Sequence, residues 1–449
     1  MIAEKSGDAR SLAALHHVVP YHTYAVGHVL LFVSLVLSAA TSLRGASRVL
    51  TLLMAFFQLP VLSPSWFTGR LWLLRVGYYK LTRPKEVAED WVWIVDHTVQ
   101  MGAEKCFVIV GVRLSALARP ECCLSHEDVE PIALCPVLQS NGAVVYQQLE
   151  DSIIKTGIPR EILGDHGSDL QAGVERFCQQ HPETCYIYDI KHKTAVVLRH
   201  ELHEDPRWQE FTRLAAHTKQ RVQQTALAFL APPNQRTKAR YMNLESLLRW
   251  GNATLIFLDA QQREPRSDMD QQLLAEKLGW LQEFREDLTV WHELLQIVEA
   301  TESFVRKQGV YRGAYRALRA ILTPLAQSAR AQKVSHHLLA FVAKQSLQAK
   351  HHERLLGSSE VIESVFGKLK RLEQDQAKGG FTGLLLSVGA MVSTTTKEVV
   401  QSALETVSTK DVLDWCKKKL GPSVQAKRKA AFAIHIKTEQ KRDQFKAAG

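Results

Sequence analysis

Three acidic residues of this chain stand where an acid needs an explanation. Asp96 follows Trp91–Val95, a run of aromatic and β-branched residues that predicts a buried strand. Asp165 ends a second short apolar run and opens the glycine-containing segment GDHGSD. Glu363 lies about one turn into a predicted amphipathic helix, beside its apolar face. A carboxylate at the end of a core strand costs desolvation energy unless a cation or hydrogen bonds compensate it.

The chemistry that these acids suit is metal-dependent. If the two strands are parallel neighbours, Asp96 and Asp165 lie side by side, and two such carboxylates repel unless a cation lies between them. With Glu363 they would form an oxygen-only site, which favours Mg²⁺ or Mn²⁺. Two such ions ~4 Å apart can activate an attacking oxygen and stabilise a leaving 3′ oxygen in phosphodiester cleavage.

Each acid also has a local alternative. Asp96, taken alone, is explained by a turn at a strand end. Ser168 or Asp169 can cap the helix that follows Asp165, which explains Asp169 but not Asp165. Glu360 lies in the first helical turn, where a negative charge is favourable whatever the function, so Glu363 is the better ligand candidate.

The elements around these acids predict the fold. Strands are expected at 91–98, 105–114, 131–138, 161–164 and 184–190, with helices at 143–155 and 170–180. Three strands, then helix, strand, helix and strand, is the order of a ribonuclease-H-like α/β mixed sheet. Such a sheet is an antiparallel meander extended by parallel strands.

The segment before this sheet reads as helical. Ser63 is expected to cap a helix that has Pro64 in its first turn and Gly77 just past its end. Together with the helix before it, this predicts a helix-turn-helix, with Arg70 and Arg75 as DNA contacts. An ordinary helical hairpin with solvated arginines is the alternative.

The remaining regions are also helical. Residues 205–349 predict long amphipathic helices, and the chain beyond residue 380 predicts small-residue helices followed by a basic tail. We therefore expect four regions: a helix-turn-helix-like region at 1–88, the ribonuclease-H-like core at 89–204 and 350–380, an all-α domain inserted at 205–349, and a helical basic segment at 381–449.

Composition constrains the partners. The net charge of +10 and the pI near 9.2 favour a polyanionic partner. Seven cysteines without a Cys-x-x-Cys pair argue against a disulfide framework and for a reducing cytoplasm, and Met1–Arg10 lacks the layout of a signal peptide. Ala25–Ala40 is very apolar but short for a membrane span, so we expect a buried helix, with a single span as the lesser alternative.

The strand with Asp96, the GDHGSD segment and the helix SSEVIESVFGKLK together resemble the DDE transposases of bacterial insertion sequences. The spacings are 165 − 96 = 69 and 363 − 165 = 198 residues. The second is similar to that of family members with an insertion domain before the glutamate helix, and the helical segment at 205–349 accounts for it.

The resemblance implies roles for particular residues. Asp96, Asp165 and Glu363 would be the catalytic ligands of two Mg²⁺ or Mn²⁺ ions. Lys370, seven residues after the glutamate, matches the lysine of a Tyr/Arg/Glu/Lys signature and would contact DNA phosphate, as would Lys368. The Tyr and Arg of that signature are absent, because the chain has Leu356 and Ser359 at those places.

Two further residues resemble family features. Asp189-Ile190-Lys191-His192 is similar to a Cys/Asp-x-x-His motif, which would direct His192 at the scissile phosphate; a structural histidine at a strand end is the alternative. Trp250 is a candidate for an insertion-domain tryptophan that stacks on a flipped base, and packing in the core is the alternative.

The resemblance implies a cytoplasmic, nucleoid-associated DNA transposase that acts as a homo-oligomer on double-stranded DNA. It would hydrolyse the element's terminal repeats to a 3′-OH and transfer that strand into target DNA. Two alternatives stay open: an inactive transposase-derived DNA-binding protein, and a metal-dependent nuclease without strand transfer.

Overall fold

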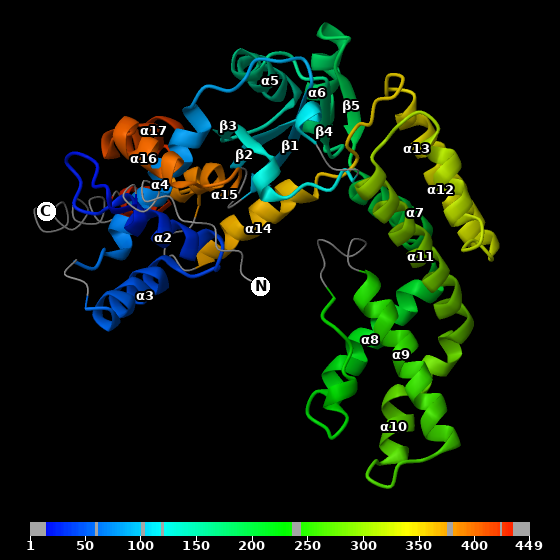
Figure 1. Ribbon diagram of the computed structural model, residues 1–449. Coiled ribbons are helices and arrows are strands. Elements are labelled where there is room, and N and C mark those ends of the chain that lie inside the picture. Colours follow the sequence, from blue (N-terminus) through cyan, green and yellow to red (C-terminus); the bar gives the residue numbers. More distant parts are fainter. Residues whose placement is uncertain are drawn as a thin grey trace, which may run out of the picture. The chain divides into compact units, whose positions relative to one another are not determined.

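The computed structural model describes residues 15–58, 62–99, 104–117, 121–235, 244–374, 380–422 and 424–433. The sequence also predicts a helix break at Leu59-Pro60, which lies outside these residues. The chain divides into two compact units (Figure 1). The first comprises Met1–Ala118, Leu124–Tyr186 and Ser359–Gly449, and the second comprises Arg119–Cys123 and Ile187–Ser358.

A five-stranded mixed sheet has the order β3-β2-β1-β4-β5. Its strands are β1 (Trp91–Val99), β2 (Lys105–Arg113), β3 (Glu130–Val137), β4 (Glu161–Gly164) and β5 (Cys185–Tyr188). β1 pairs antiparallel with β2, and β2 with β3, whereas β4 pairs parallel with β1. The predicted meander and its parallel extension are therefore confirmed for these four strands.

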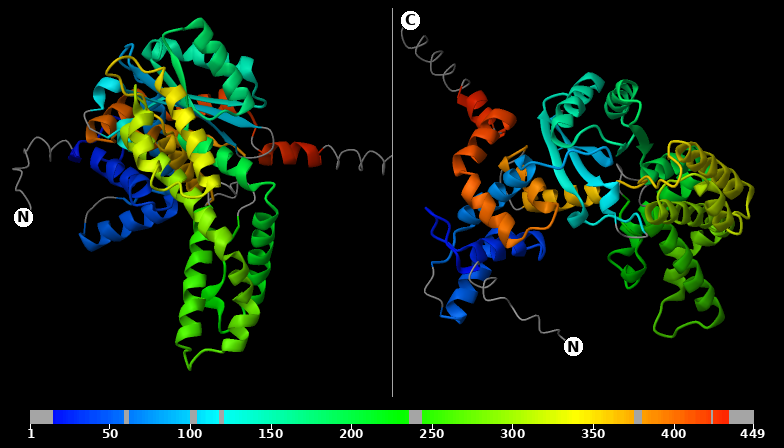
Figure 2. Two further views of the ribbon diagram at one scale, coloured as in Figure 1. Left: turned by 90° about the vertical axis from the view of Figure 1, so that its right-hand side faces the viewer. Right: turned by 45° about the horizontal axis from the view of Figure 1, so that its top comes forward.

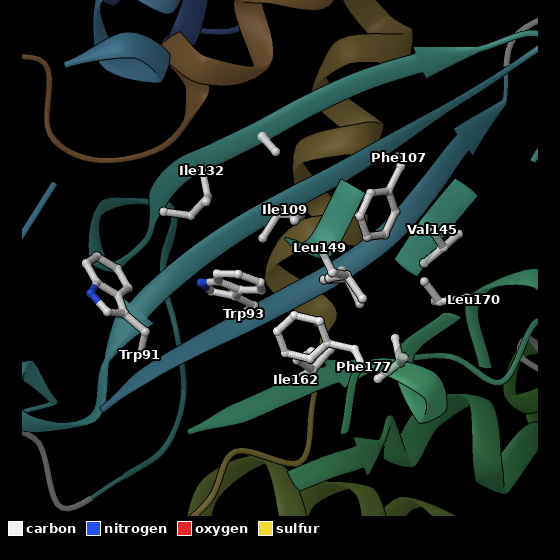
Figure 3. Close-up of a cluster of buried hydrophobic side chains, with 13 residues drawn as sticks. Trp91, Trp93, Phe107, Ile109, Ile132, Val145, Leu149, Ile162, Leu170 and Phe177 are labelled. Atoms are coloured by element: carbon white, nitrogen blue, oxygen red, sulfur yellow. The ribbon is translucent and has the colours of Figure 1, made fainter. Parts of the chain in front are cut away.

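Helices α5 (Gly142–Thr156) and α6 (Ser168–Gln180) cover one face of the sheet. The apolar side chains between them and the strands form one core, with Trp93 and Phe177 at its centre (Figure 3). The indole of Trp93 donates a hydrogen bond to Oγ1 of Thr156 at 3.1 Å, so its one polar atom is satisfied inside the core.

The side chains of the opposite face are equally buried. Val92 and Ile94 alternate with the tryptophans of β1 and have no exposed area. Helix α14 (Glu360–Gln374) packs against β1, and its buried residues are Val361, Ile362, Val365, Phe366, Leu369 and Leu372. The apolar face predicted for this helix is therefore confirmed.

The N-terminal helices are α2 (Val26–Leu37), α3 (Leu43–Phe56) and α4 (Trp66–Thr82). Ser42 caps α3, and Ser65 caps α4 by accepting a hydrogen bond from the backbone N–H of Thr68. The predicted Ser63 cap is therefore wrong by two residues. No described helix has the length and hydropathy needed to cross a membrane.

Gly77 was also expected to end α4 but lies inside it. A Cβ at Gly77 would lie 1.9 Å from the carbonyl oxygen of Leu386. The glycine therefore allows α4 to cross a later segment at backbone contact, which is a packing role and not a helix-ending one.

The C-terminal helices pack around α4 within the first unit. They are the 3₁₀ helix η6 (Gly383–Leu386), α15 (Ser387–Met391), α16 (Lys397–Thr406) and α17 (Thr409–Leu420). Lys80 of α4 has no exposed area and donates to the carbonyl oxygens of Val392 and Ser393 and to Oγ1 of Thr395, at 2.9, 2.8 and 2.7 Å. The N-terminal and C-terminal helices thus form one body.

The regular secondary structure in the described residues of the second unit is helical, apart from one isolated β-bridge and the end of β5 (Figures 1 and 2). Its helices are α7 (Ile190–Leu202), α8 (Pro206–Val222), α9 (Leu244–Arg263), α10 (Gln271–Leu278), α11 (Arg285–Gln308), α12 (Ala314–Leu322) and α13 (Ala329–Ser346). Trp208, Phe211, Phe284 and Trp291 form an aromatic core with ring centroids 4.9 to 6.3 Å apart. The predicted helical segment 205–349 lies within this unit.

Candidate active site

Asp96 and Asp165 occupy equivalent positions on neighbouring parallel strands. The register pairs Val95 of β1 with Gly164 of β4. The next residue along the first strand is Asp96, and the residue that follows the second strand is Asp165. Ile94 and Leu163 are also paired, and they belong to the face opposite Trp93 and Ile162. Because side chains alternate along a strand, Asp96 belongs to the same face as Ile94, whereas Asp165 follows the last residue of β4 and its charge acts on His97. The face of Ile94 is the one against which α14 packs.

Both carboxylates are half-buried and accept local backbone hydrogen bonds. Oδ1 of Asp96 accepts from the N–H of His97 at 2.6 Å, and Oδ1 of Asp165 accepts from the N–H of Gly167 at 3.0 Å. The hydroxyl of Tyr186 donates to the carbonyl oxygen of Asp165. Asp165 therefore does have a local partner, contrary to the expectation from sequence. The bonds from the N–H groups of His97 and Gly167 orient the two carboxylates.

Glu363 lies in the first turns of α14 and is half-buried, whereas Glu360 is exposed. Lys370 is two turns further along the same side of the helix and is exposed. Between them is Gly367, where an added Cβ would meet no atom within 4 Å. The helix surface from the glutamate to the lysine is consequently open.

The fit to a metal is partial. Asp96 and Asp165 supply oxygen ligands and paired negative charge, which suit Mg²⁺ or Mn²⁺. In the described part of the chain, however, no three His, Cys, Asp or Glu side chains lie close enough to hold a metal ion. Glu363 therefore lies on a helix that packs against β1 without completing a three-residue group in this structure.

A polar cluster on the other face was not expected from sequence. Nζ of Lys105 lies 2.7 Å from Oδ2 of Asp169, and Nε2 of His97 lies 3.2 Å from Oγ of Ser140. Burial alone would raise the pKa of the Asp169 carboxyl, but the hydrogen bonds from Lys105 and Ser140 outweigh it and lower this pKa to about 2. No local pattern in the sequence signals this cluster, because Lys105 and Asp169 are 64 residues apart and meet only in the fold.

This cluster holds the start of α6 against the sheet. Gly167 is the N-cap residue of α6, so neither Ser168 nor Asp169 caps that helix as expected. Asp169 instead ties the first turn to β2 through Lys105. The segment that carries Asp165 is thereby anchored to β2.

His192 and Trp250 belong to the second unit. His192 is in the first turn of α7 and not at a strand end; Asp189 caps that helix and accepts from the backbone N–H of His192 at 2.9 Å. The indole of Trp250 donates to the carbonyl oxygen of Leu230 at 2.9 Å, and its ring is 6.4 Å from that of Trp280. These contacts give each residue a structural role.

The predicted helix-turn-helix is not confirmed, and the middle of its second helix is buried. Six consecutive residues of α4, from Trp72 to Gly77, are buried, so this part of the helix has no exposed face for a DNA groove. Arg75 is 8% exposed and donates to the carbonyl oxygen of Leu404 at 2.7 Å. Arg70 is half-buried against Gly383, and burial lowers its pKa. Both arginines join α4 to the C-terminal helices.

No protein-family model matches this sequence, and no curated protein matches it. Among solved structures, the chain is similar to the Drosophila P element transposase strand transfer complex, with a TM-score of 0.39 and 11% sequence identity. That match covers 84% of this chain and 92% of the other.

Proposed function

We propose that the chain is a DNA transposase whose first unit is a ribonuclease-H-like catalytic core. One observation carries the proposal: the β1–β4 register pairs Val95 with Gly164, so Asp96 and Asp165 are the next residues along two neighbouring parallel strands, and α14 packs against β1. Two half-buried carboxylates in adjacent positions are electrostatically unfavourable, and a divalent cation is the partner that relieves this. The expectation of a mixed sheet made from sequence agrees with the observed strand order.

In this proposal Asp96 and Asp165 hold the metal from the sheet, and Glu363 completes the set from α14. Bound Mg²⁺ or Mn²⁺ would stabilise charge on the attacking and leaving oxygens of a phosphodiester. Lys370 would contact a DNA phosphate on the open surface of α14, next to Gly367. The hydrogen bonds from His97 and Gly167 would keep both aspartates oriented before DNA binds.

The proposed reaction has two displacements of the same kind. Water attacks the phosphodiester at the element end and releases a 3′-OH; that hydroxyl then attacks a target phosphodiester, so that one bond forms as one breaks. Two ends must be joined to one target, which is why we expect a homo-oligomer on DNA. Lys368, His192 and Trp250 are further proposed DNA contacts.

The test uses the DNA that flanks the gene as substrate, with Mg²⁺ and the purified full chain. Asp96→Asn, Asp165→Asn and Glu363→Gln are expected to lower cleavage by at least about a hundredfold. Glu360→Gln is the matched control, because it removes an exposed carboxylate from the same helix and should leave cleavage near the wild-type rate.

Three other results of the cleavage assay would change or refute the proposal. Loss of activity in Glu360→Gln with full activity in Glu363→Gln would reassign the third ligand. Cleavage without joining of the 3′-OH to target DNA would identify a nuclease. Activity that survives all three active-site changes would refute the proposed site.

A further inference from the structure

A small pocket in the first unit lies apart from the two aspartates. It is formed by the end of α2, the turn into α3, one side of α14 and the end of α15. The lining residues are Val36, Leu37, Ser38, Ala40, Thr41, Ser42, Lys368, Arg371, Leu372 and Met391. Its apolar wall is buried, since Val36, Leu372 and Met391 are each at most 8% exposed.

The charge of the lining is entirely positive. Lys368 and Arg371 are three residues apart on α14, which puts them on one side of the helix, and no carboxylate lines the pocket. The α2–α3 side cannot supply one nearby in sequence, because residues 9–85 contain no Asp or Glu. Within the described chain, neither cation forms an ion pair with a carboxylate. An anion would therefore meet no like charge from these walls.

The surroundings of Lys368 disfavour its positive charge unless an anion is bound nearby. Burial, and then the charge of Arg371, lower the pKa of the Lys368 ammonium, while Glu127 opposes them less strongly. Nζ of Lys368 lies 3.3 Å from Nδ1 of His126, whose own pKa is lowered by burial and by Lys368. A negative charge in addition to that of Glu127, bound close to Lys368 and Arg371, would relieve the repulsion between these two cations.

The turn into α3 adds hydrogen-bond donors. Ser42 caps the helix by accepting from the N–H of Gly45 at 3.0 Å, and the first N–H groups of any helix lack partners within it. The hydroxyls of Ser38 and Thr41 belong to the same lining. Ala40 has φ of 51°, a left-handed conformation that costs energy for a residue with a side chain and closes this turn tightly.

We propose that this pocket binds a phosphoryl group, with Lys368 and Arg371 on one side and the start of α3 on the other. Guanidinium and ammonium groups together with helix N–H donors are the groups that proteins use for phosphate. The phosphoryl group belongs either to free phosphate or a phosphorylated small molecule, or to a DNA backbone. The binding of a phosphoryl group here does not depend on the proposed catalytic function.

The primary experiment titrates inorganic phosphate into the full chain by calorimetry, against chloride at equal ionic strength. Saturable binding is expected, and Arg371→Gln should weaken it about tenfold because one charge-assisted contact is lost. Arg371→Lys keeps the charge and should lose less. Lys418→Gln removes an exposed cation from α17 and should leave phosphate binding unchanged.

Duplex DNA distinguishes the two sources. If the occupant is a backbone phosphate, Arg371→Gln will reduce the salt dependence of duplex binding by about one counterion, more than Lys418→Gln does. If it is a free phosphoryl compound, the two variants will bind duplex DNA alike while only Arg371→Gln loses phosphate. Equal behaviour of Arg371→Gln and Lys418→Gln in both titrations would overturn the proposal.

Discussion

Neutralising either aspartate of the candidate site should make the metal-free protein more stable, although most substitutions destabilise a protein. Asp96→Asn and Asp165→Asn each remove one of two like charges at equivalent strand ends. The local hydrogen bonds survive, since the asparagine carbonyl oxygen can accept from the N–H of His97 or Gly167 as the carboxylate does. The change therefore isolates the repulsion.

The magnitude follows from the strand spacing. Neighbouring strands are ~4.8 Å apart, and two unit charges ~5 Å apart repel by about 3 kcal/mol at an effective dielectric constant of ~20. Both carboxylates are only half-buried, so water and salt reduce this further. We expect each variant to gain about 1 kcal/mol, or roughly 2 °C in Tm.

The assay is thermal unfolding of the purified chain in EDTA, repeated across a Mg²⁺ titration. Asp414→Asn is the matched control, because it neutralises an exposed aspartate on α17 and should leave Tm unchanged. Mg²⁺ should raise the Tm of the wild type, since a ligand that binds only the folded state stabilises it. It should raise the Tm of Asp96→Asn and Asp165→Asn much less.

Two results would refute this reasoning. If both active-site variants unfold in EDTA at or below the Tm of Asp414→Asn, the two carboxylates do not repel appreciably. If Mg²⁺ stabilises wild type and both variants equally, the aspartates are not its ligands. Neither readout requires enzymatic activity, so the site can be tested before its DNA substrate is known.

Two further predictions concern the fold. Gly77→Ala should destabilise the protein by about 3 kcal/mol or more, because the new Cβ would collide with the carbonyl oxygen of Leu386. Gly367→Ala, on the open surface of α14, should instead stabilise it by about 0.5–1 kcal/mol. Urea unfolding of both variants tests this. Burial lowers the pKa of Lys80 to about 7 from its ordinary 10.5, so the unfolded chain binds more protons between these pH values and folding stability should rise with pH across that range. Lys80→Met should flatten this rise, and urea midpoints at pH 7 and 9.5 that shift equally in both proteins would contradict the assignment.

The sheet could be predicted from sequence because its signals are local. Expected and observed bounds agree within one residue for the first three strands and coincide for Glu161–Gly164. Alternating or continuous runs of aromatic and β-branched residues, ended by turn residues, determine each strand within a few positions. Strand order alone then predicts that Asp96 and Asp165 lie near each other, without knowledge of any side-chain contact.

The helices around α4 could not be predicted, because their environment comes from the far end of the chain. Ser63 and Ser65 are both acceptable caps, and only the structure selects Ser65. Gly77 is required by Leu386, and Arg75 by the carbonyl oxygen of Leu404. An arginine that looks solvated in the sequence is therefore buried, and the middle of the expected recognition helix packs into the core.

The candidate site depends on the register of β1, to within one residue. Side chains of β1 alternate between faces, so His97 meets Phe107 and Ser140 on the side of α5 and α6, while Asp96 belongs to the side of α14. A shift of the register by one residue would exchange these two side chains and remove the pair of aspartates. The tryptophans at 91 and 93 prevent that shift, because exchanging faces would take both large rings out of the α5–α6 core. The apolar pattern of the strand thus determines the register in which Asp96 and Asp165 directly follow the paired residues Val95 and Gly164.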